Sequence, residues 1–265
     1  MRALSDDMDA GVVAQVDARL AGVVAEHGVR VPWAIESGSR AWGFPSPDSD
    51  YDCRFLYVRP TRDYLTCWPP RDVIETPLDA VLDVNGWDVQ KAVQLLLRGN
   101  ATVTEWLRSP IVYDGDSAFR DGFLALADEV LDRARVGRHY LHLGQLQWSA
   151  YNGGDGRFKK FFYALRPAVA VRWLRQHPSS GLPPMDLPTL VAQADVPAAV
   201  ASEVDDLVAA KAVTRELGEG RVPPALAAFV GDELAASPEV FGDVRTDLTA
   251  QRALADDFFR SVLRP

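Results

Sequence analysis

The chain has 265 residues, of which 48% are hydrophobic, and a formal net charge of −9. This hydrophobic fraction allows a buried core and excludes an intrinsically disordered protein. The acidic balance argues against broad, sequence-independent binding of long nucleic acids, because such binding depends on many contacts between Lys or Arg and phosphates. No apolar run is long enough for a membrane span, and the acidic start lacks the apolar segment of a signal peptide, so a cytoplasmic location without a membrane partner is expected.

Helices and short strands alternate in the first part of the chain. Apolar residues at helical spacing predict a helix over residues 6–27, which ends at Gly28. Runs of β-branched and aromatic residues between turn formers predict strands at residues 32–37, 51–58, 72–76 and 80–84. Short helical segments are expected at residues 39–43 and 61–66, and a longer helix at 89–97 with Asp88 at its start.

The pattern becomes helical from about residue 116, and no strand is predicted beyond residues 112–113. The predicted helices span residues 117–133, 137–151, 158–177, 197–217 and 246–263. The glycine-rich residues 153–156 are expected to form a flexible turn between two of them. We therefore predict an α+β protein. Residues 1–115 would form a domain with a small mixed β-sheet, residues 116–265 an all-helical domain, and the active-site cleft would lie between them.

A Gly-Ser turn followed by an Asp-x-Asp pair is the segment most typical of a chemical function. Gly38 and Ser39 follow a predicted strand and open a helical turn, where backbone N–H groups can approach a phosphate, and Arg40 could reach the same anion. Asp50 and Asp52 open the next strand, and their spacing puts both carboxylates on one face. Such oxygen ligands suit hard divalent cations, and paired cations can stabilise the attacking and leaving oxygens of phosphoryl transfer.

The most basic local cluster of this acidic chain lies in the predicted helix 158–177. Lys159, Tyr163 and Arg166 share one face of that helix, and Lys160 lies on an adjoining face. Such a stripe could bind a triphosphate, with Lys as a point charge and Arg as a fork. The alternative is an ordinary solvated surface beside a core stripe of aromatic residues.

Longer stretches around these motifs carry a family resemblance over roughly residues 10–190. The matching stretches are Gly38–Gly43, Ser46–Asp52, Asn85–Asp88, Glu105–Ile111 and Lys159–Pro167. Together they resemble the DNA polymerase beta-like nucleotidyltransferase superfamily, whose signature is Gly-Ser followed by Asp-x-Asp. Within that superfamily they look like the RlaP/YcgL-type predicted nucleotidyltransferases, which are associated with RNA-repair genes in some genomes.

The resemblance implies a third carboxylate on a strand beside the Asp-x-Asp strand. Asp83 matches best, because it stands between two apolar residues. Glu75 and Asp88 are alternatives, although the place of Asp88 before a helix favours a role as N-cap. The third acid would bind metal together with Asp50 and Asp52, or act as general base for the attacking hydroxyl.

These features predict a metal-dependent nucleotidyltransferase of the EC 2.7.7 type. It would transfer a nucleoside monophosphate from a nucleoside triphosphate such as ATP, with two Mg²⁺ ions or Mn²⁺ in their place. The resemblance points to an RNA or tRNA end as acceptor, whereas the net charge of −9 points to a small molecule or a protein side chain. A non-catalytic nucleotide-binding regulatory module is a further alternative. The retained acidic pair argues against it, because unused like charges repel one another.

Overall fold

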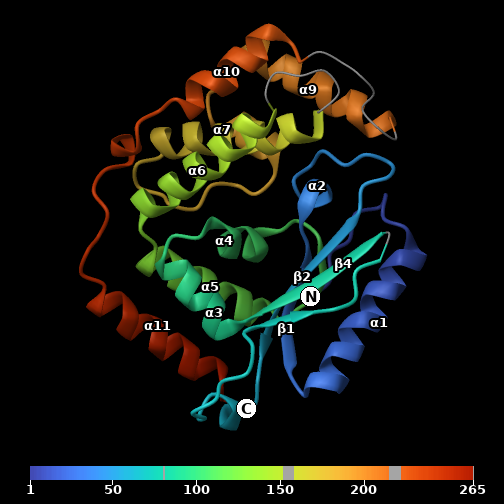
Figure 1. Cartoon of the computed structure of the whole chain (residues 1–265), viewed down its shortest axis with the longest axis vertical. Coiled ribbons are helices and arrows are strands. Elements are labelled where there is room, and N and C mark those ends of the chain that lie inside the picture. The colour runs from blue at the N-terminus through green and yellow to red at the C-terminus, as the bar shows by residue number, and fades with distance from the viewer. Residues whose placement is uncertain (80, 152–157, 215–221, 265) are drawn as a thin grey trace.

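A five-stranded mixed β-sheet forms the centre of the computed structural model, which describes residues 1–79, 81–151, 158–214 and 222–264 (Figure 1). The strands are β1 (Arg30–Glu36), β2 (Tyr51–Val58), β3 (Val73–Glu75), β4 (Leu82–Asp88) and β5 (Val112–Gly115). Their order in the sheet is β3-β4-β2-β1-β5. Only the β2–β4 pair is parallel among these neighbours, and the others are antiparallel. The predicted small mixed sheet is therefore confirmed.

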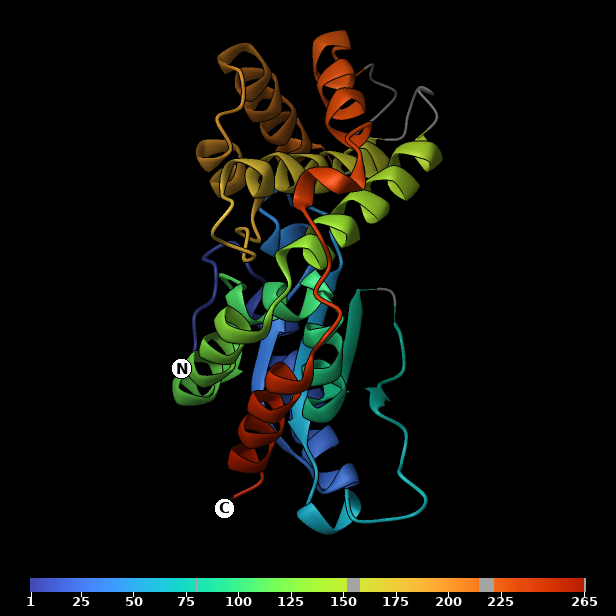
Figure 2. The same ribbon diagram turned by 90° about the vertical axis from the view of Figure 1, so that its left-hand side faces the viewer.

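Helices cover both faces of the sheet, as Figures 1 and 2 show. On one face lies α1 (Ala10–His27), which packs on Cys53 and Phe55 of β2. Leu56 and Val58 belong to the core on the opposite face. That face is covered by α3 (Val89–Leu97), α4 (Ala101–Arg108), α5 (Ser117–Val130) and α11 (Thr249–Val262). Because both faces are buried, β2 is apolar along most of its length and polar only near its start.

A second group of helices has a hydrophobic core of its own and lies across the end of the sheet where β2 begins (Figure 2). It comprises α6 (Arg133–Tyr151), α7 (Phe158–Gln176), α8 (Leu187–Gln193), α9 (Ala198–Val213) and α10 (Pro224–Leu234). We call this group the helical layer. At its centre, α7 is buried on nearly all sides, and the short α2 (Gly38–Ala41) lies where the layer meets the sheet (Figure 1). Two 3₁₀ turns, η1 (Thr61–Asp63) and η2 (Pro238–Phe241), complete the described elements.

The hydrophobic cores do not divide at residue 115 as the sequence suggested. Both α5 and α11 pack in the core beneath the sheet, so the chain leaves that core after α5 and returns to it with its last helix. Periodicity shows that a helix has an apolar face but not which core that face meets. The sequence also gave no prediction of α4, α8 or α10, and β4 continues to Asp88. The predicted turn at 153–156 and the last residues of the predicted helix 197–217 lie outside the described residues.

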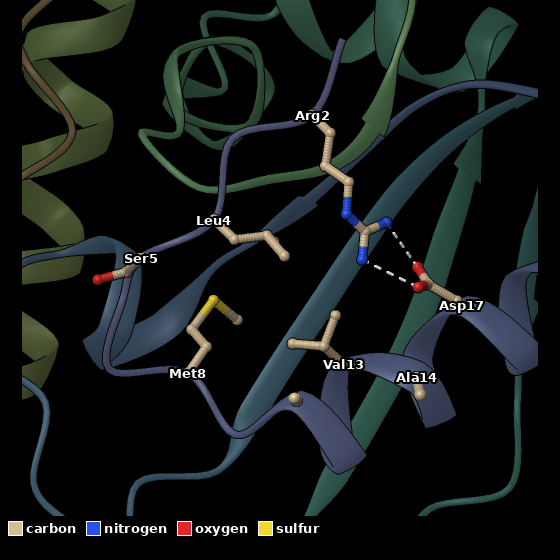
Figure 3. Close-up of a pocket in the computed structure, with 8 residues that line it drawn as sticks. Arg2, Leu4, Ser5, Met8, Val13, Ala14 and Asp17 are labelled. Carbon is tan, nitrogen blue, oxygen red and sulfur yellow. Dashed lines mark hydrogen bonds and ion pairs between the residues drawn. The ribbon is translucent and has the colours of Figure 1, made fainter.

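The N-terminal segment packs along the sheet edge and against α1. Ala3 forms an isolated bridge with Val112 of β5, and the Arg2 guanidinium forms a two-pronged ion pair with Asp17 of α1, at 2.9 Å (Figure 3). A cavity of about 320 Å³ lies beside this pair, and the side chains of Leu4, Met8 and Val13 give it a largely apolar lining. Among the described residues, no helix combines the length and apolar character that crossing a bilayer requires.

One buried ion pair joins the helical layer to the rest of the molecule. Arg166 of α7 donates two hydrogen bonds of 2.8 Å to Oε1 of Glu105 in α4, and the Tyr140 hydroxyl donates to the same oxygen at 2.7 Å. The guanidinium also donates to the carbonyl of Met185 and lies 4.3 Å from the ring centroid of Trp42. These contacts satisfy both charges, which is the condition for burying an ion pair without a large cost.

Glu105→Ala would leave the Arg166 charge buried without its partner. We expect the free energy of unfolding to fall by about 3–5 kcal/mol, measured by urea denaturation. The matched control is Arg260→Met, which breaks an exposed pair with Asp257 and should change the free energy of unfolding by less than about 1 kcal/mol. Equal effects of the two substitutions would contradict the joining role of the buried pair.

Candidate active site

Three carboxylates come together at the start of β2. The parallel register of β2 and β4 sets Asp52 directly beside Asp83, and Asp50 immediately precedes β2. Burial raises the pKa of Asp52, and the negative charges of Asp83 and Asp50 raise it further, against the opposing effect of Arg54. Asp50 and Asp83 therefore both lie within electrostatic reach of Asp52, and the site favours a positive charge.

A guanidinium supplies positive charge between two of these acids. Nη2 of Arg54 lies 3.0 Å from Oδ1 of Asp52 and 2.7 Å from Oδ2 of Asp83. The other oxygen of Asp83 accepts a hydrogen bond from Asn85. Among the described residues, no group of three or more acidic, His or Cys side chains is arranged to hold a metal ion. The donor set nevertheless suits a cation in kind, because hard carboxylate oxygens already flank a positive charge.

Gly38 is required by the Asp52 carboxylate itself. Its φ is +59°, and a Cβ added at this position would lie 2.0 Å from Oδ2 of Asp52. Any other residue would both strain the backbone and displace the carboxylate. The sequence pattern suggested that this glycine makes room for a phosphate. In the structure, the space above its backbone is filled by Asp52.

Ser39 and Arg40 order the segment that leads to the Asp-x-Asp pair. The Ser39 hydroxyl donates to the Ser49 hydroxyl at 2.9 Å. The Arg40 guanidinium donates to the carbonyls of Ser49 at 2.7 Å and Asp50 at 3.3 Å, and lies 4.0 Å from the ring centroid of Tyr51. Both side chains were expected to bind phosphate, and both bind the chain between residues 49 and 51 in this structure.

Glu36 is a residue of the site that the sequence reasoning missed. It is the last residue of β1, is fully buried, and its Oε1 accepts a 2.9 Å hydrogen bond from the backbone N–H of Asp52. The Tyr113 hydroxyl donates to Oε2. Burial raises the pKa of Glu36 to about 7. A single acid at the end of an otherwise apolar strand, directly before the Gly-Ser turn, was the signal that could have identified it.

Of the three alternatives for the third acid, Asp83 is the one that lies beside Asp52. Glu75 points to the surface of β3, where its carboxylate pairs with Arg71 at 2.8 Å. Asp88 caps α3 by accepting a 2.8 Å hydrogen bond from the N–H of Gln90. The N-cap role favoured for Asp88 is therefore confirmed.

The helical layer brings part of the basic stripe to the carboxylates. Burial raises the pKa of Tyr163, and the charges of Asp52 and Asp50 raise it further. Its ring meets that of Trp42 edge-on at 5.3 Å. The exposed Lys159 lies near enough to help lower the pKa of Asp52, whereas Lys160 is directed toward the carbonyl of Ala150.

Arg166 does not share the surface with Lys159 and Tyr163. Its side chain is almost fully buried, and its guanidinium is occupied by Glu105 and the carbonyl of Met185. The expectation that Arg166 binds a triphosphate is corrected here. Arg166 lies on the same face of α7 as Lys159 but about two turns further along the helix, where that face meets Glu105 of α4, a packing that helical spacing alone does not reveal.

Comparison with known proteins identifies the family. The family described as "RlaP: RNA repair pathway DNA polymerase beta family" matches residues 12–261. This chain belongs to that family. It is also 36% identical over 192 residues to "Uncharacterized protein YcgL" of Bacillus subtilis (strain 168), a match that covers 72% of this chain and 73% of the relative. The family is of the DNA polymerase beta-like, nucleotidyltransferase type and is implicated in RNA repair.

Glu36→Gln should change how stability depends on pH. Because the folded-state pKa is about 7 and the ordinary value is 4.5, the native protein holds a proton that the unfolded chain releases between these pH values. The contribution of Glu36 is therefore fully present below pH 4.5 and is lost as the pH rises through 7. This loss, on the order of 3 kcal/mol, should be absent from Glu36→Gln. Urea denaturation of both proteins across this range checks it, and a constant difference between them would contradict it.

Arg54→Met should make the protein depend on an added cation. Without the guanidinium, Asp52 and Asp83 repel each other, and we expect the free energy of unfolding to fall by about 2 kcal/mol in a chelating buffer. Mn²⁺ should then raise the melting temperature of this variant more than that of the wild type. Arg19→Met, which removes a surface pair with Asp79, is the control and should respond to Mn²⁺ like the wild type. Equal responses of all three proteins would contradict the assignment.

Proposed function

We propose that this protein transfers a nucleoside monophosphate from a nucleoside triphosphate to the end of an RNA. The observation that carries the proposal is the meeting of Asp50, Asp52 and Asp83 beside the Gly38-Ser39 turn, in a chain of the RNA-repair polymerase beta family. Members of nucleotidyltransferase-type families typically use divalent metals. Here Asp50, Asp52 and Asp83 would hold them, with Mg²⁺ as the preferred ion.

The chain's own residues would prepare an in-line displacement at the α-phosphate. An acceptor hydroxyl oxygen forms a bond to the α-phosphorus, the bond to the bridging oxygen breaks, and pyrophosphate leaves. Divalent cations, when bound, would neutralise the phosphate charge at these carboxylates. Asp83 is our choice for the carboxylate that accepts the hydroxyl proton. Glu36 acts indirectly, because its hydrogen bond to the Asp52 amide holds the start of β2 in place.

The choice of RNA as acceptor rests on the family and on the local charge. Although the whole chain is acidic, Arg40 binds the backbone carbonyl of Asp50, and Lys159 and Tyr163 lie within electrostatic reach of Asp52. Binding a short RNA end needs few contacts with phosphates. The net charge of −9 therefore argues against binding along a long RNA but is compatible with binding an RNA end. A small molecule or a protein side chain would be the acceptor if RNA fails as a substrate.

Label transfer from each radioactive nucleoside triphosphate to total RNA with Mg²⁺ tests the proposal. We expect Asp52→Asn and Asp83→Asn to lower the rate at least about 100-fold, because each removes a ligand for a cation worth several kcal/mol to the transition state. Glu75→Gln is the matched control on the neighbouring strand, and its rate should stay within about twofold of wild type.

Three outcomes would count against the proposal. If Asp52→Asn transferred label at the wild-type rate, the assignment of Asp52 as a cation ligand would be wrong. Loss of activity in Glu75→Gln with none in Asp83→Asn would reverse the choice of third acid. Metal-dependent nucleotide binding without label transfer to RNA, small molecules or proteins would instead favour a regulatory module.

A further inference from the structure

Lys211, near the end of α9, is an unusual lysine because its side chain is buried. It is 6% exposed, and its ammonium donates a hydrogen bond to the carbonyl of Phe44, in the segment between Ser39 and Asp50. The same ammonium lies 4.9 Å from the ring centroid of Phe44 and 5.4 Å from that of Phe162 in α7. Figure 1 shows α9 above α2, at the end of the sheet where β2 begins. Lys211 therefore ties the helical layer to the segment that carries the Asp-x-Asp pair.

These contacts compensate the charge of Lys211 only in part. An ammonium has three donors. In the described part of the chain, the Phe44 carbonyl is its one hydrogen-bond acceptor, and no carboxylate lies within ion-pair distance. Burial, and after it the positive charge of Lys159, lower the pKa of Lys211 to about 8, with Asp48 acting in the opposite direction. Burying a cation without an anionic partner is costly, so the position is suited to an anion that the described residues do not supply.

Lys159 provides a second cation at the same place. It is exposed on the first turn of α7, and no described carboxylate pairs with it. Its charge acts both on Lys211 and on Asp52, so it lies within electrostatic reach of the buried ammonium and of one carboxylate of the site. One multiply charged anion that bound both ammonium groups would offset the repulsion between their positive charges.

The position of the two lysines indicates which phosphates of a nucleoside triphosphate they would contact. When the α-phosphate of a nucleoside triphosphate lies at the carboxylates for attack, the two terminal phosphates extend away from them. We propose that Lys211 and Lys159 bind the β- and γ-phosphates and retain pyrophosphate after transfer. The identity of this ligand rests on the proposed function. Lys211 thus takes the place that the helical pattern suggested for Arg166, whose charge is occupied by Glu105.

A purely structural role for Lys211 and a role in anion binding predict different properties for Lys211→Met. If Lys211 only fixed the Phe44 segment, Lys211→Met would unfold more easily and bind anions as before. If Lys211 is an anion ligand, Lys211→Met removes a desolvated charge and keeps an aliphatic side chain of similar length. Its melting temperature should then match or exceed that of the wild type, because replacing a poorly compensated buried charge by an apolar group is neutral or stabilising.

Isothermal titration with inorganic pyrophosphate, with and without Mg²⁺, separates the two roles. We expect Lys211→Met to bind pyrophosphate at least about tenfold more weakly than the wild type, which corresponds to about 1.4 kcal/mol. Lys211→Arg should restore part of this loss, because the charge returns. Lys91→Met is the matched control, because Lys91 pairs with Asp72 on the surface, and its pyrophosphate affinity should equal that of the wild type.

The outcomes distinguish this inference from the proposed function. Equal pyrophosphate affinities of wild type and Lys211→Met, or no measurable binding to the wild type, would overturn the inference even if label transfer to RNA is observed. Tenfold weaker binding by Lys211→Met with an unchanged melting temperature would support it. That result would stand as evidence of a polyphosphate site even if the wild type transferred no label, in which case only the proposed function would fail.

Discussion

Asp52 and Asp83 stand side by side because β2 and β4 pair in parallel in one particular register. A shift of that register by one residue would turn Asp83 toward the face of the sheet that α1 covers, and would place Leu82 or Val84 beside Asp52. The register is held by burial on both faces, since Leu82 and Val84 pack under α1 whereas Leu56 and Val58 pack under the helices opposite. The position of the acids is therefore a consequence of how the core is packed.

The charged side chains around these acids already have partners within the chain. Arg54 lies between two carboxylates, Arg40 binds backbone carbonyls, and the Asp52 carboxylate fills the space above Gly38. The site is thus preorganised before any ligand binds. A cation bound between Asp52 and Asp83 would have to displace a guanidinium that already pairs with both carboxylates.

The helical layer gives this acidic site its positive surroundings. The whole chain carries a net charge of −9, yet Lys159 of α7 lies near enough to act on Asp52, and Lys211 of α9 contacts Phe44 in the segment that leads to the Asp-x-Asp pair. The placement of α7 rests on the buried pair between Arg166 and Glu105, which joins α7 to α4, and on the contact of Arg166 with Trp42 just beyond α2. One buried arginine therefore joins the two parts of the molecule, whereas Lys159 and Lys211 have no ion-pair partner among the described residues.

The sequence by itself determined most of the local elements and the candidate site residues. Alternating apolar residues defined β2 to the residue, and the Gly-Ser and Asp-x-Asp spacing identified Gly38, Asp50 and Asp52, because these features depend on near neighbours in the chain. Asp83 could be ranked first only through the family resemblance. The tertiary structure alone decided that α5 and α11 share the core of the sheet and that Arg166 is buried against Glu105. It also brought Glu36 and Arg54 into contact with Asp52, and Lys211 into contact with Phe44. Each of these depends on a partner that lies on a different element, and local periodicity holds no information about which elements meet.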